Sequence, residues 1–314
     1  MKIDKNILIT GGAGFIGSNI TEFLLNNNVK FIRIFDNLST GKKDNIQFLL
    51  DKFPNLEFNY GSITNLEDCR KAMKDIDIVC HQAALGSVPR SVNDPLSSHQ
   101  NNVNGFFNIL LSAKEEGIKR IVYASSSSVY GDNPILPKVE ENTGNVLSPY
   151  AATKAIDEIY AGVFTKCYNM EIIGLRYFNI FGPRQDPNGA YAAVIPKFIN
   201  LMKSGKQPTI NGNGTFSRDF THVDNAVQAN ILAMTTNNNE TFGNVFNIGC
   251  GGQYTLNELI IIINKGLGTD IKPNYGPNRP GDIPHSNADI TKAQNMLGYQ
   301  PKIKFEEGII NLCC

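Results

Sequence analysis

The sequence has few of the residue pairs that bind metals or form redox centres. Its six cysteines and four histidines are scattered over 314 residues, and no two cysteines are separated by two residues. Zinc sites and dithiol motifs use this close spacing, so the sequence predicts no metal site. The dispersed cysteines favour reduced thiols, as in the cytosol.

Long apolar segments and an excess of one charge are also missing. No apolar run approaches the 18 or so residues of a membrane span, and the start of the chain shows no charged-then-apolar leader. Lysine and arginine number 29, as do aspartate and glutamate. We therefore expect a soluble, cytoplasmic protein without a nucleic-acid or membrane partner. The length allows two lobes.

A glycine-rich turn follows the first apolar segment. Residues 6–10 read as a strand buried on both faces, and residues 11–17 continue as Gly-Gly-Ala-Gly-Phe-Ile-Gly. Glycines at this spacing let the backbone approach a pyrophosphate, and a helix from about Ser18 to Asn26 would aim its N–H groups at the phosphates. No Gly-Lys-Ser/Thr follows, which excludes a P-loop.

An acidic residue ends the second predicted strand. Phe31 to Phe35 is followed by Asp36, 19 residues beyond Gly17. A carboxylate at this distance can bind the ribose hydroxyls of a dinucleotide. The next residue is Asn37, with no arginine for a 2′-phosphate. The sequence therefore predicts NAD as the cofactor, and not NADP.

Strands and helices continue to alternate, which predicts an α/β fold: a Rossmann-type doubly wound parallel sheet with a smaller C-terminal α/β substrate-binding lobe. Further strands are expected at residues 56–60, 76–81 and 120–125, and helices at 66–73 and 94–116. Residues 86–90 are expected to form a short loop. The small residues Gln82-Ala83-Ala84 would let a cofactor lie across the sheet edge.

Tyr150 and Lys154 open a predicted helix. Ser148 is a good N-cap and Pro149 suits the first helical position. Four residues span about one turn, so both side chains share a face near the positive end of the helix dipole. An ammonium nearby favours the phenolate, and the pair therefore reads as a proton acceptor. The serines at 125–128 end a strand at the same sheet edge.

These motifs together resemble the extended short-chain dehydrogenase/reductase family, and within it the nucleotide-sugar 4-epimerases. The resemblance covers essentially the whole chain. It rests on residues 11–17, Asp36-Asn37, 126–131, Tyr150-x-x-x-Lys154, Arg176-Tyr177-Phe178-Asn179-Ile180-Phe181-Gly182-Pro183, Ser217-Arg218-Asp219-Phe220 and Arg279-Pro280-Gly281-Asp282.

The resemblance implies a catalytic triad of Ser126, Tyr150 and Lys154. Tyr150 would take the proton from the sugar O4 while the C4 hydride passes to NAD, and Ser126 would hydrogen-bond the same oxygen. The 4-keto sugar would then turn and take the hydride back on its other face. Related dehydratases carry an acid behind the triad hydroxyl. Here Ser127 and Ser128 occupy those positions, which disfavours elimination.

The resemblance also implies contacts to the cofactor and the substrate. The cofactor residues are Gly11, Gly14, Phe15, Ile16, Gly17, Asp36, Asn37, Ser39, Gly41, Ser62, Ile63, Gln82, Ala83, Ala84, Tyr150, Lys154 and Tyr177. The substrate residues are Gly86, Ser87, Ser126, Ser127, Ser128, Tyr150, Asn179, Ala193, Val194, Lys197, Thr209, Asn211, Arg218, Arg279, Asp282 and Ser286. Among these, Arg218 and Arg279 suit a diphosphate because the guanidinium fork binds its oxygens in pairs.

The expected division is an NAD-binding domain of residues 1–180 plus about 221–250, and a nucleotide-sugar lobe of about 181–220 and 251–314. The segments at 84–91 and 185–191 resemble epimerases of UDP-N-acetylhexosamines, including those that feed surface-polysaccharide synthesis. Ser286 falls where that group has a small residue, which leaves room for an N-acetyl group. UDP-GlcNAc is therefore the expected substrate. The alternatives are UDP-glucose and the corresponding uronate, whose carboxylate would be bound by Arg90 or another cation.

Two further expectations concern assembly and a different class of function. The resemblance implies a homodimer through helices near residues 100–116 and 150–168. A non-catalytic NAD-binding scaffold would share the same fold, because fold alone does not fix function. The intact Ser126, Tyr150 and Lys154 argue against that alternative.

Overall fold

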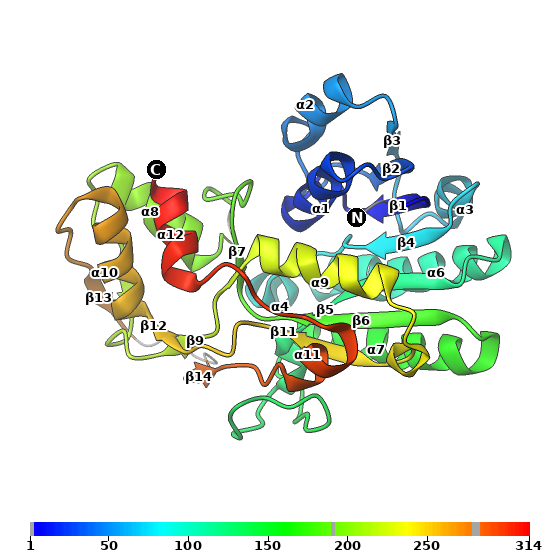
Figure 1. Ribbon diagram of the computed structural model, residues 1–314. Helices are drawn as coiled ribbons and strands as arrows, with labels where there is room; N and C mark the ends of the chain where they lie inside the picture. Colours follow the sequence, from blue (N-terminus) through cyan, green and yellow to red (C-terminus); the bar gives the residue numbers. More distant parts are fainter. Residues whose placement is uncertain (1–2, 190–191, 278–282) are drawn as a thin grey trace.

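The computed structural model of the chain describes residues 3–189, 192–277 and 283–314. Its main body is a seven-stranded parallel sheet with helices on both faces (Figure 1). The strands lie in the order β11-β6-β5-β4-β1-β2-β3. In chain order they are β1 (Asn6–Thr10), β2 (Phe31–Asp36), β3 (Leu56–Tyr60), β4 (Ile78–His81), β5 (Arg120–Ser126), β6 (Glu171–Tyr177) and β11 (Val245–Ile248). The predicted doubly wound α/β fold is confirmed.

Different helices cover the two faces of the sheet. Successive strand residues point to opposite sides, so each face has its own hydrophobic cluster. On β1, Ile7 and Ile9 pack in one hydrophobic cluster and Leu8 in the other. The first cluster includes residues of α1 (Phe15–Asn26), α2 (Asp44–Lys52), α9 (Val223–Thr235) and α11 (Thr291–Leu297). The second includes residues of α3 (Leu66–Met73), α6 (Gly105–Glu116) and α7 (Pro149–Tyr168).

The segment after β4 differs from its prediction. Residues 86–90 were expected as a loop, but helix α4 spans Val88–Asn93. Ser87 caps this helix by accepting a hydrogen bond from the Arg90 N–H at 3.3 Å, and Pro89 lies in its first turn, where no N–H is needed. The prediction of a loop was therefore wrong, although the N-cap serine and the proline of the first turn can both be read from the sequence.

The single helix predicted for residues 94–116 has three parts. Helix α5 (Pro95–His99) is followed by a π-helical turn, η1 (Gln100–Asn104), and then by α6. Asp94 separates α4 from α5 with non-helical backbone, φ −139° and ψ 79°, because a residue before proline is disfavoured in the helical region. Its side chain accepts a hydrogen bond from the Ser97 N–H and so caps α5.

A second group of elements lies beside the edge of the sheet at which the parallel strands end (Figure 1). Its helices are α8 (Val194–Lys203), α10 (Leu256–Leu267) and α12 (Phe305–Cys313). They share a separate hydrophobic cluster that includes Phe198, Leu259 and Phe305. The short strands are β7 (Ile180–Phe181), β8 (Thr209–Asn211), β9 (Ser217–Arg218), β10 (Thr221–His222), β12 (Tyr254–Thr255), β13 (Asn274–Gly276) and β14 (His285–Ser286).

Helix α11 follows β14 in the chain but packs with the sheet, since Ala293 and Leu297 belong to the cluster around α1 and α9. The exact division of the chain into two domains stays a prediction. Among the helices of the described residues, none is both long enough and apolar enough to cross a membrane.

Candidate functional site

A cavity of about 290 Å³ lies against the glycine-rich turn at the start of α1. Most of the residues predicted to bind the cofactor line it. These are Gly11, Gly14, Phe15, Ile16, Gly17, Asp36, Asn37, Ser39, Ile63, Gln82, Ala83 and Ala84. Gly86, predicted to contact the substrate, lines the same cavity. The geometry therefore gathers residues from the ends of β1, β2 and β4 into one place.

The glycine turn is closely packed, which explains its residue types. A Cβ on Gly17 would lie 2.3 Å from the carbonyl oxygen of Gly11, and one on Gly11, whose φ is +67°, would lie 2.7 Å from the Ala83 nitrogen. Helix α1 begins after Gly14 without a side-chain cap. Its first N–H groups and its dipole suit a pyrophosphate, so this part of the structure fits a dinucleotide.

Asp36 ends β2 at the wall of the cavity. Its Oδ2 accepts a hydrogen bond from the Ala13 N–H at 3.0 Å, and its Oδ1 accepts one from Leu38 at 2.8 Å. Burial raises the pKa of this carboxyl group, and the two backbone bonds oppose that effect. Gly41 lies alongside, because a Cβ there would be 2.9 Å from Asp36 Oδ2. These contacts hold the carboxylate in a position that suits its predicted role, which is to accept hydrogen bonds from the ribose hydroxyl groups.

Five predicted cofactor residues do not line this cavity. Tyr150 and Lys154 belong to α7 and are described below, and the other three are Gly41, Ser62 and Tyr177. Gly41 contacts it through Asp36, and Ser62 lines a neighbouring cavity with Asn37 and Ser39. Tyr177 is connected to it through Gln82, whose Oε1 accepts a hydrogen bond from the Tyr177 hydroxyl at 3.0 Å. All three therefore lie one contact away from the cavity lining.

Helix α7 begins as predicted. The Ser148 hydroxyl accepts a hydrogen bond from the Ala151 N–H at 3.1 Å, and Pro149 lies in the first turn. Tyr150, half-buried, donates its peptide N–H to Ser91 Oγ at 3.0 Å. Helix α4, which carries Ser91, is thereby attached to the turn that presents the tyrosine.

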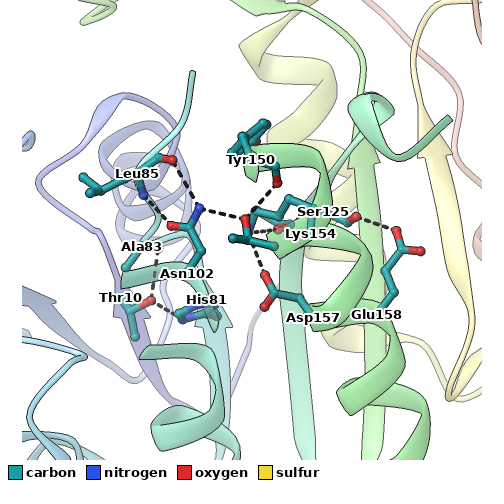
Figure 2. A network of polar contacts seen from close by, with 12 residues as sticks. Thr10, His81, Ala83, Leu85, Asn102, Ser125, Tyr150, Lys154, Asp157 and Glu158 are labelled. Carbon is teal, nitrogen blue, oxygen red and sulfur yellow. Dashed lines mark hydrogen bonds and ion pairs between the residues drawn. The ribbon is translucent and has the colours of Figure 1, made fainter. Parts of the chain in front are cut away.

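Lys154 is buried below Tyr150 on the same face of α7 (Figure 2). Its Nζ donates to the Ala124 carbonyl of β5 at 2.9 Å and lies 3.1 Å from Asp157 Oδ2. Burial raises the pKa of Asp157 to about 6, although the Lys154 charge opposes this. On β4, burial and the charge of Lys154 lower the pKa of His81 to about 3, so the imidazole is neutral.

Ser126 is the last residue of β5, two residues beyond the carbonyl that Lys154 contacts. Its Oγ accepts a hydrogen bond from the Ser128 N–H at 3.2 Å and so caps the 3-10 turn η2 (Ser127–Tyr130). The hydroxyl oxygen of Ser128 is buried without a hydrogen-bond partner among the described residues. The neighbouring Ser125 donates to Glu158 of α7 at 2.5 Å, which ties the strand end to the helix.

Asn102, which the sequence analysis missed, joins the cofactor cavity to α7 (Figure 2). Its side chain accepts from the Leu85 N–H at 2.8 Å, donates to the Leu85 carbonyl at 3.2 Å and donates to Thr153 Oγ1 at 3.0 Å. A buried polar residue within a helix was the available signal, but its partners come from distant segments. Thr40, Leu85 and Asn101 also line the cavity and were missed.

A second cavity, of about 280 Å³, lies among the elements around α8. It brings together predicted substrate residues from four segments, namely Asn179, Val194, Lys197, Thr209, Asn211 and Arg218. Ala193 precedes Val194 as the N-cap of α8, and Ser286 is paired with Arg218 between β14 and β9. Ser87 lies instead at the start of α4. Arg279 and Asp282 are outside the described residues.

Within the described part of the chain, no group of three or more His, Cys, Asp or Glu side chains is arranged to hold a metal ion. The polar residues around both cavities are instead suited to a dinucleotide and to a second phosphate-bearing ligand. The assigned roles of the individual residues stay predictions.

Known proteins resemble the chain over nearly its whole length. A UDP-N-acetylglucosamine 4-epimerase from Methanobrevibacter ruminantium M1, in complex with UDP-N-acetylmuramic acid, is 42% identical with a TM-score of 0.92, covering 98% of this chain and 96% of that one. A UDP-glucuronic acid 4-epimerase from Bacillus cereus, with UDP-glucuronic acid and NAD, is 33% identical with a TM-score of 0.88, covering 97% and 96%. A UDP-glucose 4-epimerase from Mycolicibacterium smegmatis is 34% identical over 307 residues, 96% of this chain and 95% of that protein.

The model of the NAD dependent epimerase/dehydratase family matches residues 7–249, which include the glycine turn, Asp36, Ser126, Tyr150 and Lys154. The match, the parallel sheet and the glycine-lined cavity agree on the cofactor, which is NAD. The chain belongs to the NAD dependent epimerase/dehydratase family, in the extended branch of the short-chain dehydrogenases/reductases.

Proposed function

We propose that this chain inverts C4 of a UDP-N-acetylhexosamine and so interconverts UDP-GlcNAc and UDP-GalNAc. It is an NAD-dependent nucleotide-sugar 4-epimerase of the family described above. The observation that carries the proposed chemistry is the position of α7: Lys154 contacts the Ala124 carbonyl, two residues before Ser126, and Tyr150 lies one turn earlier on the same helix face.

In the proposed reaction, Ser126 hydrogen-bonds the sugar O4 and the Tyr150 oxygen takes the O4 proton. The Lys154 ammonium, one helical turn from Tyr150, stabilises the phenolate because an opposite charge nearby favours the charged form. Bound NAD supplies the redox chemistry by storing the C4 hydride and returning it. The 4-keto sugar turns before the hydride returns, so Tyr150 gives its proton back to an O4 on the other face.

Two features support an N-acetylated sugar. Ser286 is paired with Arg218, which lines the second cavity, and its small side chain is of the size expected where the sugar carries an N-acetyl group. The similar protein from M. ruminantium is a UDP-GlcNAc 4-epimerase. UDP-glucose and UDP-uronates are the alternatives, since other similar epimerases act on those sugars. Ser127 and Ser128, in place of an acid, disfavour dehydration.

The test is turnover of UDP-GlcNAc, UDP-glucose and UDP-N-acetylglucosaminuronate by the purified protein without added NAD, with C4 epimers followed by NMR. A preference for UDP-GlcNAc supports the substrate assignment. A preference for another sugar keeps the reaction and changes the substrate. If none of the three is epimerised, even with NAD added, the scaffold and dehydratase alternatives return to contention.

The protein is further proposed to be a cytoplasmic homodimer that supplies surface-polysaccharide synthesis. Ile159 and Val163, about one turn apart on α7, are 65% and 45% exposed, and they are the apolar side chains of α7 against which we expect a second copy to pack. Light scattering that gives the mass of one chain at micromolar concentration would remove the dimer.

A further inference from the structure

Asp157 is a buried carboxylate to which the proposed reaction gives no role. It lies one turn after Lys154 on α7, and its side chain is 1% exposed. One oxygen, Oδ2, is 3.1 Å from the Lys154 ammonium, whereas Oδ1 is buried without a partner among the described residues. A buried carboxylate with an unpaired oxygen is costly, and a buried ion pair by itself is weak evidence of added stability. Its presence therefore calls for another explanation.

Tyr150, Lys154 and Asp157 form one stripe at helical positions i, i+4 and i+7 (Figure 2). Lys154 lies between the phenol and the carboxylate. The Lys154 side chain is only 2% exposed, so little water reaches its charge, and a charge removed from water needs a partner. The Ala124 carbonyl supplies a dipole but no negative charge. A counter-ion is needed to keep the ammonium charged.

The other charged or titratable groups on elements packed against α7 do not take that place. They are Arg90, His99, Lys114, Glu115, Glu116, Arg120, Tyr123, Tyr130, Glu171, Arg176 and Tyr177.

The carboxylates of Glu115 and Glu116 are at the exposed end of α6, and Glu171 pairs with Arg120. On α7 itself, both oxygens of Glu158 are bonded to Arg176.

The phenols are also neutral. Burial raises the pKa of Tyr123, Tyr130 and Tyr177, and His81 on β4 is neutral as described above. Among the described residues, Asp157 is thus the carboxylate in contact with the Lys154 ammonium.

We propose that Asp157 is a positioning residue that keeps Lys154 charged and directed towards Ala124, so that Lys154 can act on Tyr150. This inference rests on the proposed epimerase function. Asp157 also repels a phenolate at Tyr150 directly, but two helical turns separate them, on the order of 10 Å. Coulomb energies fall with distance, so the attraction between Asp157 and Lys154 at 3.1 Å is roughly three times larger than the repulsion between Asp157 and a Tyr150 phenolate. The net effect of Asp157 is therefore to favour the charged Lys154.

The experiment uses Asp157→Asn, which keeps the shape of the side chain and one oxygen acceptor but removes the charge. Lysine labelled with ¹³C and ¹⁵N at the side-chain end is titrated by NMR in the full-length protein, and Lys154→Arg identifies the signal. We expect the Lys154 ammonium of Asp157→Asn to lose its proton at least about one pH unit below the wild type. The alkaline limb of kcat should move by the same amount, with KM unchanged.

Two matched variants make the test specific. Glu116→Gln removes an exposed carboxylate and should leave the Lys154 titration unchanged, whereas Asp157→Glu keeps the charge and should restore most of the wild-type titration. An unshifted titration in Asp157→Asn overturns the inference, as does an equal shift in Asp157→Glu. The NMR titration needs no turnover, so it decides about Asp157 even if the wild type epimerises no sugar.

Discussion

Ser91 Oγ accepts the peptide N–H of Tyr150 at 3.0 Å and donates to the Val88 carbonyl at 2.8 Å. A residue of the segment that follows β4 thus holds the first turn of α7, on which the predicted proton acceptor lies. The segment carrying Gly86 and Ser87 is short and ends in this contact. Any movement of that segment on substrate binding would therefore also shift the backbone of Tyr150 through this hydrogen bond.

Tyr150→Phe should reduce kcat by roughly 10²- to 10⁴-fold, the usual contribution of a positioned acid or base, because only the proton-accepting oxygen is lost. The amount of NAD that co-purifies is measured in the same preparations, so that a loss of cofactor is distinguished from a loss of the chemical step. Tyr168→Phe, at the 46% exposed far end of the same helix, is the control and should remain fully active. Epimerisation at an undiminished rate in Tyr150→Phe would mean that the assigned mechanism is wrong.

Asp36→Ala should weaken NAD binding by about 10- to 100-fold, since a hydrogen bond to a charged group contributes about 1.5–3 kcal/mol. The variant should discriminate less between NAD and NADP, because the negative charge that repels a 2′-phosphate is gone. Calorimetric titration of both dinucleotides measures the two effects. Equal NAD affinities in variant and wild type would place the ribose elsewhere.

Gly17→Ala should close the glycine turn, because the new Cβ would lie 2.3 Å from the Gly11 carbonyl oxygen, a backbone atom that cannot move aside. We expect a lower melting temperature and at least a tenfold loss of NAD affinity. Gly162→Ala in α7 is the matched control: a Cβ there meets nothing within 4 Å, and the helix should gain about 0.5–1 kcal/mol. Similar NAD affinities in the two variants would contradict the prediction that the glycine turn binds the pyrophosphate of NAD.

Asp219 should make folding stability depend on pH. It is fully buried, and burial raises its pKa to about 6 despite hydrogen bonds from the backbone N–H groups of Cys250, Gly251 and Ala288. The folded state therefore holds this proton more tightly than the unfolded state. The resulting stability is complete below about pH 4 and is lost as the pH rises through 6, by up to about 3 kcal/mol.

The measurement for Asp219 is urea unfolding of the wild type and of Asp219→Asn, which cannot titrate, between pH 4 and 7. The wild-type free energy of unfolding should fall relative to that of the variant across this range. A constant difference between the two proteins would show that burial does not raise the pKa of Asp219 above its value in the unfolded state.

Ser286→Tyr should reduce kcat/KM for UDP-GlcNAc by at least about tenfold and leave the value for UDP-glucose within about threefold, because a bulky ring would fill the space for the N-acetyl group. Coupled assays with the two sugars measure the ratio. A parallel loss for both substrates would point to general damage at β14 and not to a specificity position.

Sequence patterns predicted what depends on neighbouring residues. The glycine turn and the start of α7 at Ser148 are local signals, and the structure has both, although α1 begins at Phe15, three residues before the predicted start at Ser18. The break in the helix at Asp94 also has a local cause, the following Pro95, although the helix predicted for residues 94–116 does not include this break. Asn102 could not be foreseen, because its partners Leu85 and Thr153 are 17 and 51 residues away and meet it only after the sheet has formed.

The path of the chain limits how this protein can be rebuilt. Segments around 194–220 and 254–277 share one hydrophobic cluster, yet β11 at 245–248 lies in the main sheet between them, and α11 returns to that sheet before α12 leaves it again. A transplant of specificity from a related enzyme therefore cannot be made at a single splice point. Several exchanged pieces would have to be grafted together, with the backbone donors that Asp219 binds among them.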